Sequence, residues 1–104
     1  MKVEVLYFEG CPNHVPAIAM VQRVLAREGI EAQIVSLDVH DVETATKLRF
    51  LGSPSIRLNG VDIEPGRQYD PPFFGCRTYN VHGKMVGVPP EEWLSEAVRA
   101  ASRN

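Results

Sequence analysis

The chain has 104 residues, of which 44% are hydrophobic and 23% are charged, and this composition excludes a chain that is disordered along most of its length. Eleven basic and thirteen acidic residues give a net charge of −2, which provides no basic surface for nucleic acid. No apolar stretch reaches the roughly 18–20 residues of a membrane span, and we expect one cytoplasmic domain over residues 1–104 without a membrane partner.

The first thirty residues predict a strand followed by a helix. Residues 2–8 are mostly apolar, which is typical of a buried strand. Apolar side chains then recur at helical spacing as far as about Glu28. Pro16 lacks the N–H that a helix interior needs, so this helix either kinks there or starts regularly only near Val15.

A second strand and a short second helix follow. The apolar residues within 31–37 predict a strand that is parallel to the first, because a helix connects the two. Asp41 is a favoured N-cap residue, and the next helix is expected to begin after it and to close at Gly52. The start of the chain is therefore predicted to be a β-α-β unit with one further helix.

A hairpin and a loop are predicted next. Asn59-Gly60 separates residues 55–58 from residues 61–64 and is a strong signal for a type I′ turn. Residues 65–75 contain three prolines and two glycines without periodicity, and we expect a surface loop. Because a hairpin is antiparallel, the predicted sheet is mixed, with parallel strands first and antiparallel strands last.

The last thirty residues predict a second hairpin and a final helix. Residues 77–81 and residues 84–86 can pair over a His-Gly turn. Pro90 at the first helical position, followed by two acidic residues at the positive end of the helix, starts a helix that runs to about residue 102. The expected fold class is therefore α/β.

Two short motifs carry a resemblance to a known family. The first, at the junction of the first strand and helix, is Gly10-Cys11-Pro12-Asn13-His14, and the second, just before the first hairpin, is Gly52-Ser53-Pro54-Ser55. In this order of elements, the two motifs resemble those of the thioredoxin superfamily over most of the chain. The resemblance implies a thioredoxin-like three-layer sandwich with a mixed central sheet, here with an extra C-terminal hairpin. It also implies that Pro54 is cis and lies against the active cysteine, so that Ser53 and Pro54 offer a backbone edge for an extended thiol substrate.

A narrower similarity involves three strings of residues. The chain is similar, over nearly its whole length, to a group of small bacterial thioredoxin-like proteins. The strings that carry this similarity are residues 6–14, residues 50–54 and Cys76-Arg77-x-Tyr79. Some members of that group carry an alkylmercury lyase label. The similarity adds a hint of soft metals to the thiol chemistry that the superfamily implies.

Cys11 stands at the start of the predicted first helix. Backbone N–H groups without partners and the positive end of the helix dipole both favour a thiolate at this position, and the thiolate is the nucleophilic form of cysteine. Pro12 sets the backbone angle of the first helical turn without losing a hydrogen bond. Cys11 is therefore the candidate nucleophile, with Pro12 and Asn13 forming the helix N-terminus beside it.

His14 occupies the place of the second cysteine in the dithiol pattern Cys-x-x-Cys. It lies one helical turn from Cys11, where an imidazolium can pair with the thiolate or a neutral imidazole can act as a base. The alternative is a capping or solvated histidine without a chemical role. Both interpretations stay open at this point.

Cys76 is the second candidate thiol. In the fold that the resemblance implies, the chain after the first hairpin returns to the end of the sheet that carries Cys11, and the loop ends at Cys76. We therefore predict a Cys11/Cys76 redox pair in which Cys76 is the resolving thiol, which requires Cα atoms about 4.4–6.8 Å apart. The alternative is a buried, small and apolar Cys76.

Two neighbours of Cys76 are further candidates. Arg77 is the charge expected near the site, where it can hold an anionic thiol such as a glutathione carboxylate, and a solvated strand end is the alternative. Phe73-Phe74 forms either an exposed apolar rim for a partner or a buried loop anchor.

Cys11, His14 and Cys76 also form a soft S, N, S donor set suited to mercury, copper or zinc. The sequence therefore supports functions of different classes. The first is a thioredoxin- or glutaredoxin-like thiol-disulfide oxidoreductase without a cofactor, in which Cys11 attacks a protein or small-molecule disulfide. Cys76 or a small external thiol then resolves the mixed disulfide. The second is a soft-metal or thiol-ligand binding module that uses the same residues without turnover, and the third is a redox-inactive fold for protein contact. The oligomeric state stays open.

Overall fold

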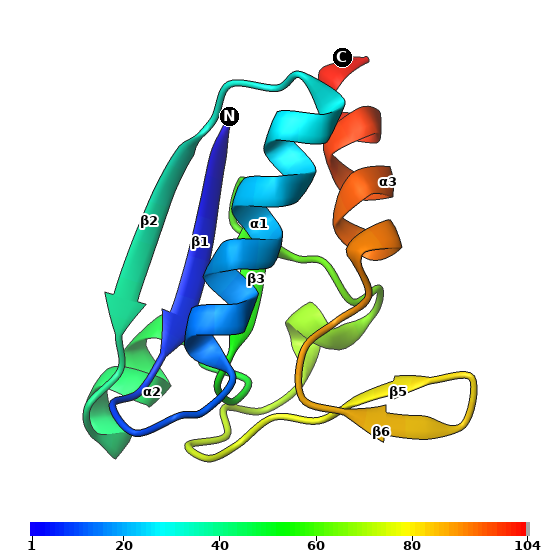
Figure 1. Cartoon of the computed structure of the whole chain (residues 1–104). Coiled ribbons are helices and arrows are strands. Elements are labelled where there is room, and N and C mark those ends of the chain that lie inside the picture. Colours follow the sequence, from blue (N-terminus) through cyan, green and yellow to red (C-terminus); the bar gives the residue numbers. More distant parts are fainter. Residues whose placement is uncertain (104) are drawn as a thin grey trace.

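The chain forms an α/β structure in which three α-helices cover a mixed sheet (Figure 1). The computed structural model describes residues 1–103. The elements in chain order are β1 (Lys2–Tyr7), α1 (His14–Glu28), β2 (Gln33–Asp38), α2 (Val42–Leu48), β3 (Ser55–Leu58), β4 (Val61–Asp62), the 3₁₀ turn η1 (Arg67–Tyr69), β5 (Tyr79–Val81), β6 (Lys84–Val86) and α3 (Glu91–Ser102). The α/β class expected from the sequence is therefore confirmed.

The four-stranded sheet has the order β2-β1-β3-β4. β1 and β2 run parallel, with Val3 beside Ile34, whereas β3 runs antiparallel to β1, with Leu58 beside Val3. β4 pairs with β3 in the antiparallel direction, and β5 and β6 form a separate two-stranded ribbon. The expectation of a sheet that is parallel first and antiparallel last is confirmed, and the C-terminal hairpin lies outside this sheet.

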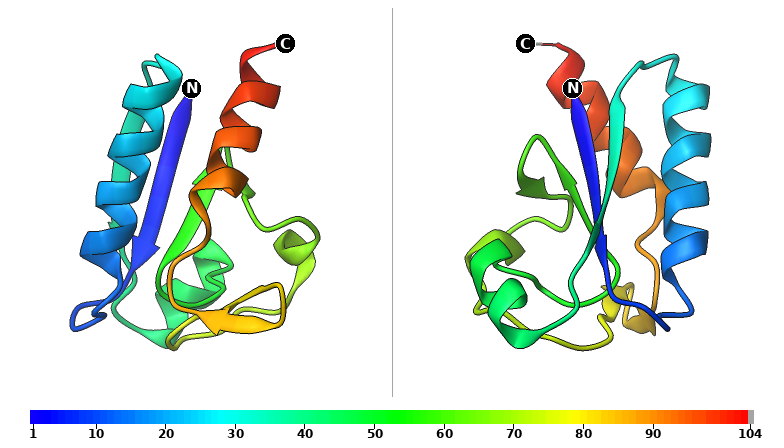
Figure 2. Two further views of the ribbon diagram at one scale, coloured as in Figure 1. Left: turned by 45° about the vertical axis from the view of Figure 1, so that its right-hand side comes forward. Right: turned by 90° about the vertical axis from the view of Figure 1, so that its left-hand side faces the viewer.

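Helices cover both faces of the sheet because alternate side chains of a strand point to opposite sides. Val3 and Val5 of β1 join the larger apolar core, to which α1 and α3 contribute. Leu6 of β1 lies in a second core with Ala45 of α2 and with Phe50. In the right-hand view of Figure 2, α1 and α2 lie on opposite sides of β1.

α1 begins at His14, and Pro16 is therefore within its first turn. The first four N–H groups of a helix have no acceptor within the helix, so the missing N–H of Pro16 costs no hydrogen bond. The N–H of Ala17 makes the first such bond, to the carbonyl of Asn13 at 3.1 Å. Of the two alternatives, a kink or a regular start near Val15, the structure supports the regular start.

α2 begins as expected but ends earlier. Asp41 caps it, because its Oδ1 accepts a hydrogen bond from the N–H of Thr44 at 2.7 Å. The predicted end at Gly52 is wrong, because Arg49 already adopts the left-handed conformation, with φ 55°, and ends the helix after Leu48. Gly52 instead lies in the bend before β3, where it has a positive φ of 103°.

Both hairpins turn over the predicted residue pairs. Asn59 and Gly60 have φ 50° and 85°, and the His-Gly pair before β6 has φ 51° and 84°, so both turns have the positive angles of type I′. The first hairpin is shorter than predicted, because β4 ends at Asp62 rather than at residue 64. In the second hairpin, β5 begins at Tyr79 rather than at residue 77.

The remaining elements differ only locally from the prediction. Pro90 is the residue before α3, with extended backbone, rather than the first helical residue. Residues 65–75 form the predicted connection, which contains the short turn η1. Within residues 1–103, none of the helices combines the length and the apolar composition that a membrane crossing requires.

Candidate thiol site

Cys11 lies in the turn that joins β1 to α1. The N–H of Cys11 closes this turn by donating to the carbonyl of Phe8 at 3.2 Å, and Gly10 supplies the positive φ of 87° that the turn requires. Because α1 starts at His14, its unpaired N–H groups and the positive end of its dipole lie next to this turn. Only 5% of Cys11 is exposed. The thiol therefore lies just before a helix start and is covered from solvent.

Pro12 and Asn13 connect this turn to the helix. Pro12 is exposed, whereas Asn13 is half-buried. The Asn13 amide makes no capping hydrogen bond within the described chain and instead lies against Gly87, where an added Cβ atom would overlap it. Gly87 thus lets the chain between β6 and α3 pass close to the Cys11 turn.

His14 is oriented differently from the expected partner or base of the thiol. Its ring stacks on Tyr7, with 4.2 Å between ring centroids and 10° between ring planes. Its Nδ1 lies 3.4 Å from the carbonyl oxygen of Cys11, to which it donates a long hydrogen bond when Nδ1 carries the proton. Within residues 1–103, no hydrogen bond joins His14 to the Cys11 sulfur. The structure thus shows the imidazole against a ring and a carbonyl, and a role of His14 toward the thiol stays a prediction.

The second motif lies directly beside the Cys11 turn. The Ser53–Pro54 peptide bond is cis, as the resemblance implied. Ser53 is fully buried, and its Oγ accepts a hydrogen bond from the N–H of Phe8 at 3.3 Å. Since the carbonyl of Phe8 accepts from Cys11, both polar backbone groups of Phe8 are used to join the two motifs. Ser53 is thereby fixed to the turn that carries the candidate nucleophile.

Cys76 lies on the backbone edge of Ser53. The N–H of Ser53 donates to the carbonyl of Gly75 at 2.8 Å, and the N–H of Arg77 donates to the carbonyl of Ser53 at 2.9 Å. Ser53 and Cys76 are therefore neighbours in a short parallel bridge. This observation corrects the expectation that Ser53 and Pro54 offer a backbone edge to an extended substrate, because residues 75–77 of the chain itself already occupy that edge.

The two cysteines differ in exposure. Cys76 is exposed, so the alternative of a buried, apolar Cys76 is wrong. Cys11 and Cys76 are both free thiols. Figure 1 shows the turn before α1, the start of β3 and the chain before β5 at the same end of the sheet. The redox pair stays a prediction, with both thiols on segments that Ser53 joins.

Arg77 is an anchor of the Cys76 segment. Its side chain is 1% exposed, and its guanidinium donates to the two carboxylate oxygens of Asp62 at 2.6 and 2.9 Å and to Glu64 and Ser55 at 3.0 Å each. The guanidinium also lies 4.3 Å from the centroid of the Tyr79 ring. Burial by itself lowers the pKa of Arg77, but the hydrogen bonds and the charge of the acidic partners outweigh burial and raise this pKa above its ordinary value. Both expectations for Arg77, the ligand of an anionic thiol and the solvated strand end, are therefore wrong.

The partners of Arg77 were not predicted from the sequence. Tyr79 is fully buried, its hydroxyl donates to the carbonyl of Pro54 at 2.6 Å, and burial raises its pKa. For Asp62 and Glu64, the spacing in the sequence indicated a shared acidic face, because side chains two residues apart in an extended segment lie on the same face. Nothing local in the sequence indicated that Arg77 pairs with that face.

The structure does not assemble the expected metal site. Among residues 1–103, no three His, Cys, Asp or Glu side chains lie close enough together to hold one ion. The donor set of Cys11, His14 and Cys76 is corrected accordingly, since the His14 ring is stacked on Tyr7 and Cys76 is exposed.

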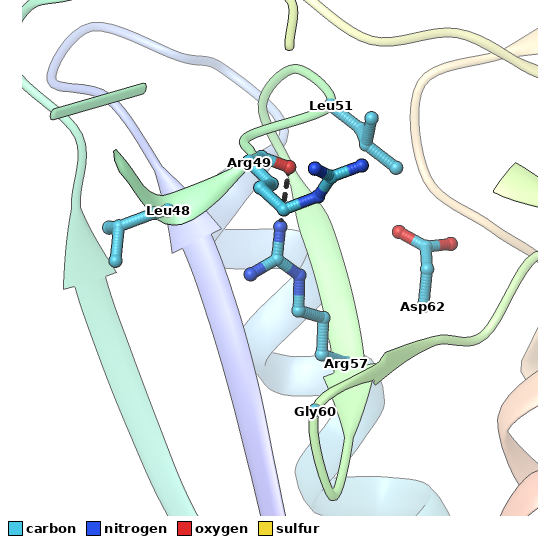
Figure 3. Close-up of a pocket in the computed structure, with 6 residues that line it drawn as sticks. All are labelled: Leu48, Arg49, Leu51, Arg57, Gly60 and Asp62. Atoms are coloured by element: carbon cyan, nitrogen blue, oxygen red, sulfur yellow. Dashed lines mark hydrogen bonds between the residues drawn. The ribbon is translucent and has the colours of Figure 1, made fainter. Parts of the chain in front are cut away.

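A small pocket beside α2 belongs to a helix end rather than to the thiol site (Figure 3). Arg57 donates there to the carbonyl of Arg49 at 2.7 Å, which gives the C-terminal end of α2 a cationic partner. Partial burial lowers the pKa of Arg57. The pocket has a volume of about 90 Å³, and neither cysteine is among the residues that line it.

The described site therefore consists of a covered thiol at a helix start, a buried serine followed by a cis-proline, and an exposed thiol on the backbone edge of that serine. Such a set of groups can exchange disulfides through two thiols. Comparison of the chain with family models, with curated proteins and with solved structures finds no match.

Proposed function

We propose that this chain is a thioredoxin-like thiol-disulfide oxidoreductase with Cys11 as the nucleophile and Cys76 as the resolving thiol. The observation that carries the proposal is the position of Cys76 on Ser53. The hydroxyl of Ser53 binds the N–H of Phe8, and the carbonyl of Phe8 binds the N–H of Cys11. Two thiols that are far apart in the sequence thus belong to segments that one buried serine joins.

The fold supports the thioredoxin-like part of the proposal. A mixed sheet lies between helices on both faces, the cysteine turn follows the carboxyl end of β1, and a cis-proline precedes β3. The resemblance of the two motifs implies the same three features. Ligands of open α/β sheets commonly bind at the carboxyl ends of the strands, which is where the Cys11 turn lies.

The proposed reaction has two exchange steps. The Cys11 thiolate attacks one sulfur of a substrate disulfide, forms a mixed disulfide with it and releases the other sulfur as a thiolate, which takes up a proton. The Cys76 thiolate then attacks the Cys11 sulfur, forms the Cys11–Cys76 disulfide and releases the second substrate thiol. The substrate gains two electrons and the chain loses two. An external dithiol returns the chain to its reduced form.

Each neighbouring group has a defined part in this proposal. The N-terminal end of α1 stabilises the thiolate of Cys11 both before attack and when it departs as the leaving group. His14 holds the turn through its contact with the Cys11 carbonyl rather than by moving a proton. Because only 5% of Cys11 is exposed, the groups that cover it must move aside when a disulfide approaches.

The test is a single-turnover reaction of the reduced full chain with excess bis(2-hydroxyethyl) disulfide, a neutral substrate. The wild type should release two substrate thiols and become lighter by two hydrogens, as measured by intact mass. Cys76→Ser should release one thiol and keep a mixed disulfide on Cys11. Cys11→Ser should react at least about 100-fold more slowly, because the thiolate favoured by the helix end is lost.

Cys11→Ser and Cys76→Ser are a matched pair, since each replaces one sulfur atom by oxygen. Equal rates for Cys11→Ser and the wild type contradict the assigned nucleophile. Stoichiometric uptake of mercury(II) by the wild type, without reaction with the disulfide, would support the alternative function, a binding module without turnover.

A further inference from the structure

A cavity opens at the carboxyl ends of β1 and β2, beside the Cys11 turn. Its volume is about 270 Å³, and it is lined by Phe8, Glu9, Asp38, His40, Phe74 and Gly75. Phe8 and Glu9 belong to the chain that leads into the Cys11 turn, and Gly75 directly precedes Cys76, so both thiol-bearing segments form its walls. Small-ligand sites usually have about 300–1,000 Å³, and this cavity is therefore suited to one side chain rather than to a large cofactor.

Aromatic rings form the apolar part of this cavity. Phe8 and Phe74 meet edge to face, with ring centroids 5.7 Å apart, and Phe50 lies 6.4 Å from Phe74 on the buried side. Phe73 and Phe74 are 54% and 40% exposed, which supports the exposed rim and not the buried anchor for this pair. An exposed aromatic surface inside a concave site offers apolar contact area to a partner.

Acidic groups surround this aromatic surface. Glu9 and Asp38 are exposed at the cavity, and the described residues that line it include no lysine or arginine. His40 lies 3.4 Å from the carboxylate of Asp41, which brings a third acidic group close. Arg77, which was expected to hold an anionic thiol, is neutralised by its own buried partners. The cavity therefore attracts cations and repels anionic thiols such as glutathione.

The occupied backbone edge of Ser53 limits how the chain can recognise a substrate. An extended substrate cannot pair with the N–H and carbonyl of Ser53, because Gly75 and Arg77 already bind both groups. At this edge, the substrate must then be recognised through side chains rather than through backbone hydrogen bonds to Ser53. The cavity is a concave surface of suitable size whose walls come from both thiol-bearing segments.

We propose that this cavity selects the substrate: it binds an aromatic side chain next to the reactive cysteine of a positively charged peptide disulfide. The inference rests on the proposed oxidoreductase function, to which it adds the substrate class. The aromatic side chain packs on Phe8 and Phe74, and basic residues on either side of it face Glu9 and Asp38. This geometry places the neighbouring cysteine of the substrate beside the Cys11 turn.

The test compares three symmetric pentapeptide disulfides with blocked ends. The first has the order Lys-Phe-Cys-Gly-Lys, the second replaces both lysines by glutamate, and the third replaces phenylalanine by alanine. The second-order rate with the reduced full chain is measured for each, with bis(2-hydroxyethyl) disulfide as the reference. The basic aromatic peptide should react roughly ten-fold faster than either of the others, relative to the reference.

Variants of the cavity should remove this preference, and the peptide rates of each variant are expressed relative to its own rate with the reference disulfide. Phe74→Ala should abolish the advantage of phenylalanine over alanine, whereas Tyr69→Ala, which changes an exposed aromatic residue outside the cavity, should keep it. Glu9→Gln with Asp38→Asn should abolish the advantage of the basic over the acidic peptide. Glu31→Gln with Glu96→Gln is the matched control, since it removes two exposed charges that do not line the cavity.

A binding measurement separates failure of this inference from failure of the proposed function. The Cys11→Ser chain is titrated with the basic peptide carrying serine in place of cysteine, and the amide signals of Phe8, His40 and Gly75 are followed by NMR. Shifts of these signals support the cavity even if no disulfide reacts, and Phe74→Leu checks the result in a chain that keeps apolar packing. Turnover of the reference disulfide with equal rates for all three peptides overturns the inference and leaves the oxidoreductase function standing. Absence of both binding and preference also overturns it.

Discussion

The segment around Cys11 and the segment around Cys76 meet at Ser53, but different forces hold them there. The Cys11 turn has a covered thiol, one closing backbone hydrogen bond and the stacked ring of His14. The Cys76 segment has an exposed thiol, and the next residue, Arg77, is buried between two carboxylates. One segment therefore covers its thiol and is held by backbone and ring contacts, and the other exposes its thiol next to a buried ion pair.

This difference indicates which segment moves during disulfide exchange. Where the approach of the two sulfurs displaces a backbone, one of these two segments must move. Moving the Cys76 segment breaks hydrogen bonds of a buried ion pair, which is strongly unfavourable. Moving the Cys11 turn breaks backbone hydrogen bonds such as the one between Cys11 and Phe8, but no buried ion pair. We therefore expect the Cys11 turn to approach Cys76.

Arg77→Met tests the anchor and should have the largest effect. It leaves the Asp62 carboxylate buried without its partner, and we expect the free energy of unfolding to fall by about 3–5 kcal/mol. Urea unfolding followed by circular dichroism measures it. Arg99→Met is the matched control, since it breaks an ion pair with Glu28 in which the arginine side chain is 56% exposed, and its effect should be smaller. Equal losses for the two variants contradict the anchoring role of Arg77.

Gly52→Ala and Gly10→Ala compare the space beside the two segments. Both glycines have positive φ, 103° and 87°, so both variants strain the backbone by about 1–2 kcal/mol. A Cβ atom on Gly52 would also lie 2.9 Å from the Cβ atom of Arg77, whereas one on Gly10 has no neighbour within 4 Å. Gly52→Ala should therefore lose about 1–3 kcal/mol more in urea unfolding. A greater loss for Gly10→Ala refutes the described packing.

Ser53→Ala tests the connection between the segments. The N–H of Phe8 loses its acceptor, and we expect a loss of about 1 kcal/mol in the free energy of unfolding. The rate at which the Cys11–Cys76 disulfide forms should fall as well, because the turn is no longer fixed beside Cys76. Ser36→Ala, in an exposed position of β2, is the control and should change neither quantity. A Ser53→Ala chain that behaves like this control shows that Ser53 does not connect the thiols.

His14→Gln should have the smallest effect. The imidazole faces the Cys11 carbonyl, so we expect the rate of the Cys11 reaction to change by less than about three-fold, whereas loss of a proton-transfer group costs about 100-fold or more. The rate ratio of variant to wild type should also stay constant between about pH 6 and 8, where histidine titrates. A large or pH-dependent loss restores His14 as a base.

Local patterns in the sequence predicted most elements of the fold. Asp41 has a side chain that caps a helix, and Asn59-Gly60 has the backbone freedom that a type I′ turn needs, so both features follow from neighbouring residues alone. The early end of α2 was missed because Arg49 adopts a left-handed conformation that glycine usually provides.

The candidate site was predictable only in part, for a physical reason. The place of Cys11 before a helix follows from local sequence, and the motif resemblance supplied Pro54. The burial of Arg77 depends on Asp62, which reaches it only through tertiary packing. The aromatic cavity likewise combines three separate segments of the chain, and no local pattern indicates such a combination.

The most direct test of the central claim is disulfide mapping of the oxidised chain. Reduced protein is treated with one equivalent of bis(2-hydroxyethyl) disulfide, free thiols are alkylated, and the peptides are identified by mass spectrometry after proteolysis. The account predicts a peptide pair in which Cys11 is bonded to Cys76 within one chain, with no alkylated cysteine left. Recovery of Cys76 in its alkylated form, with Cys11 alone carrying the substrate sulfur, would contradict it.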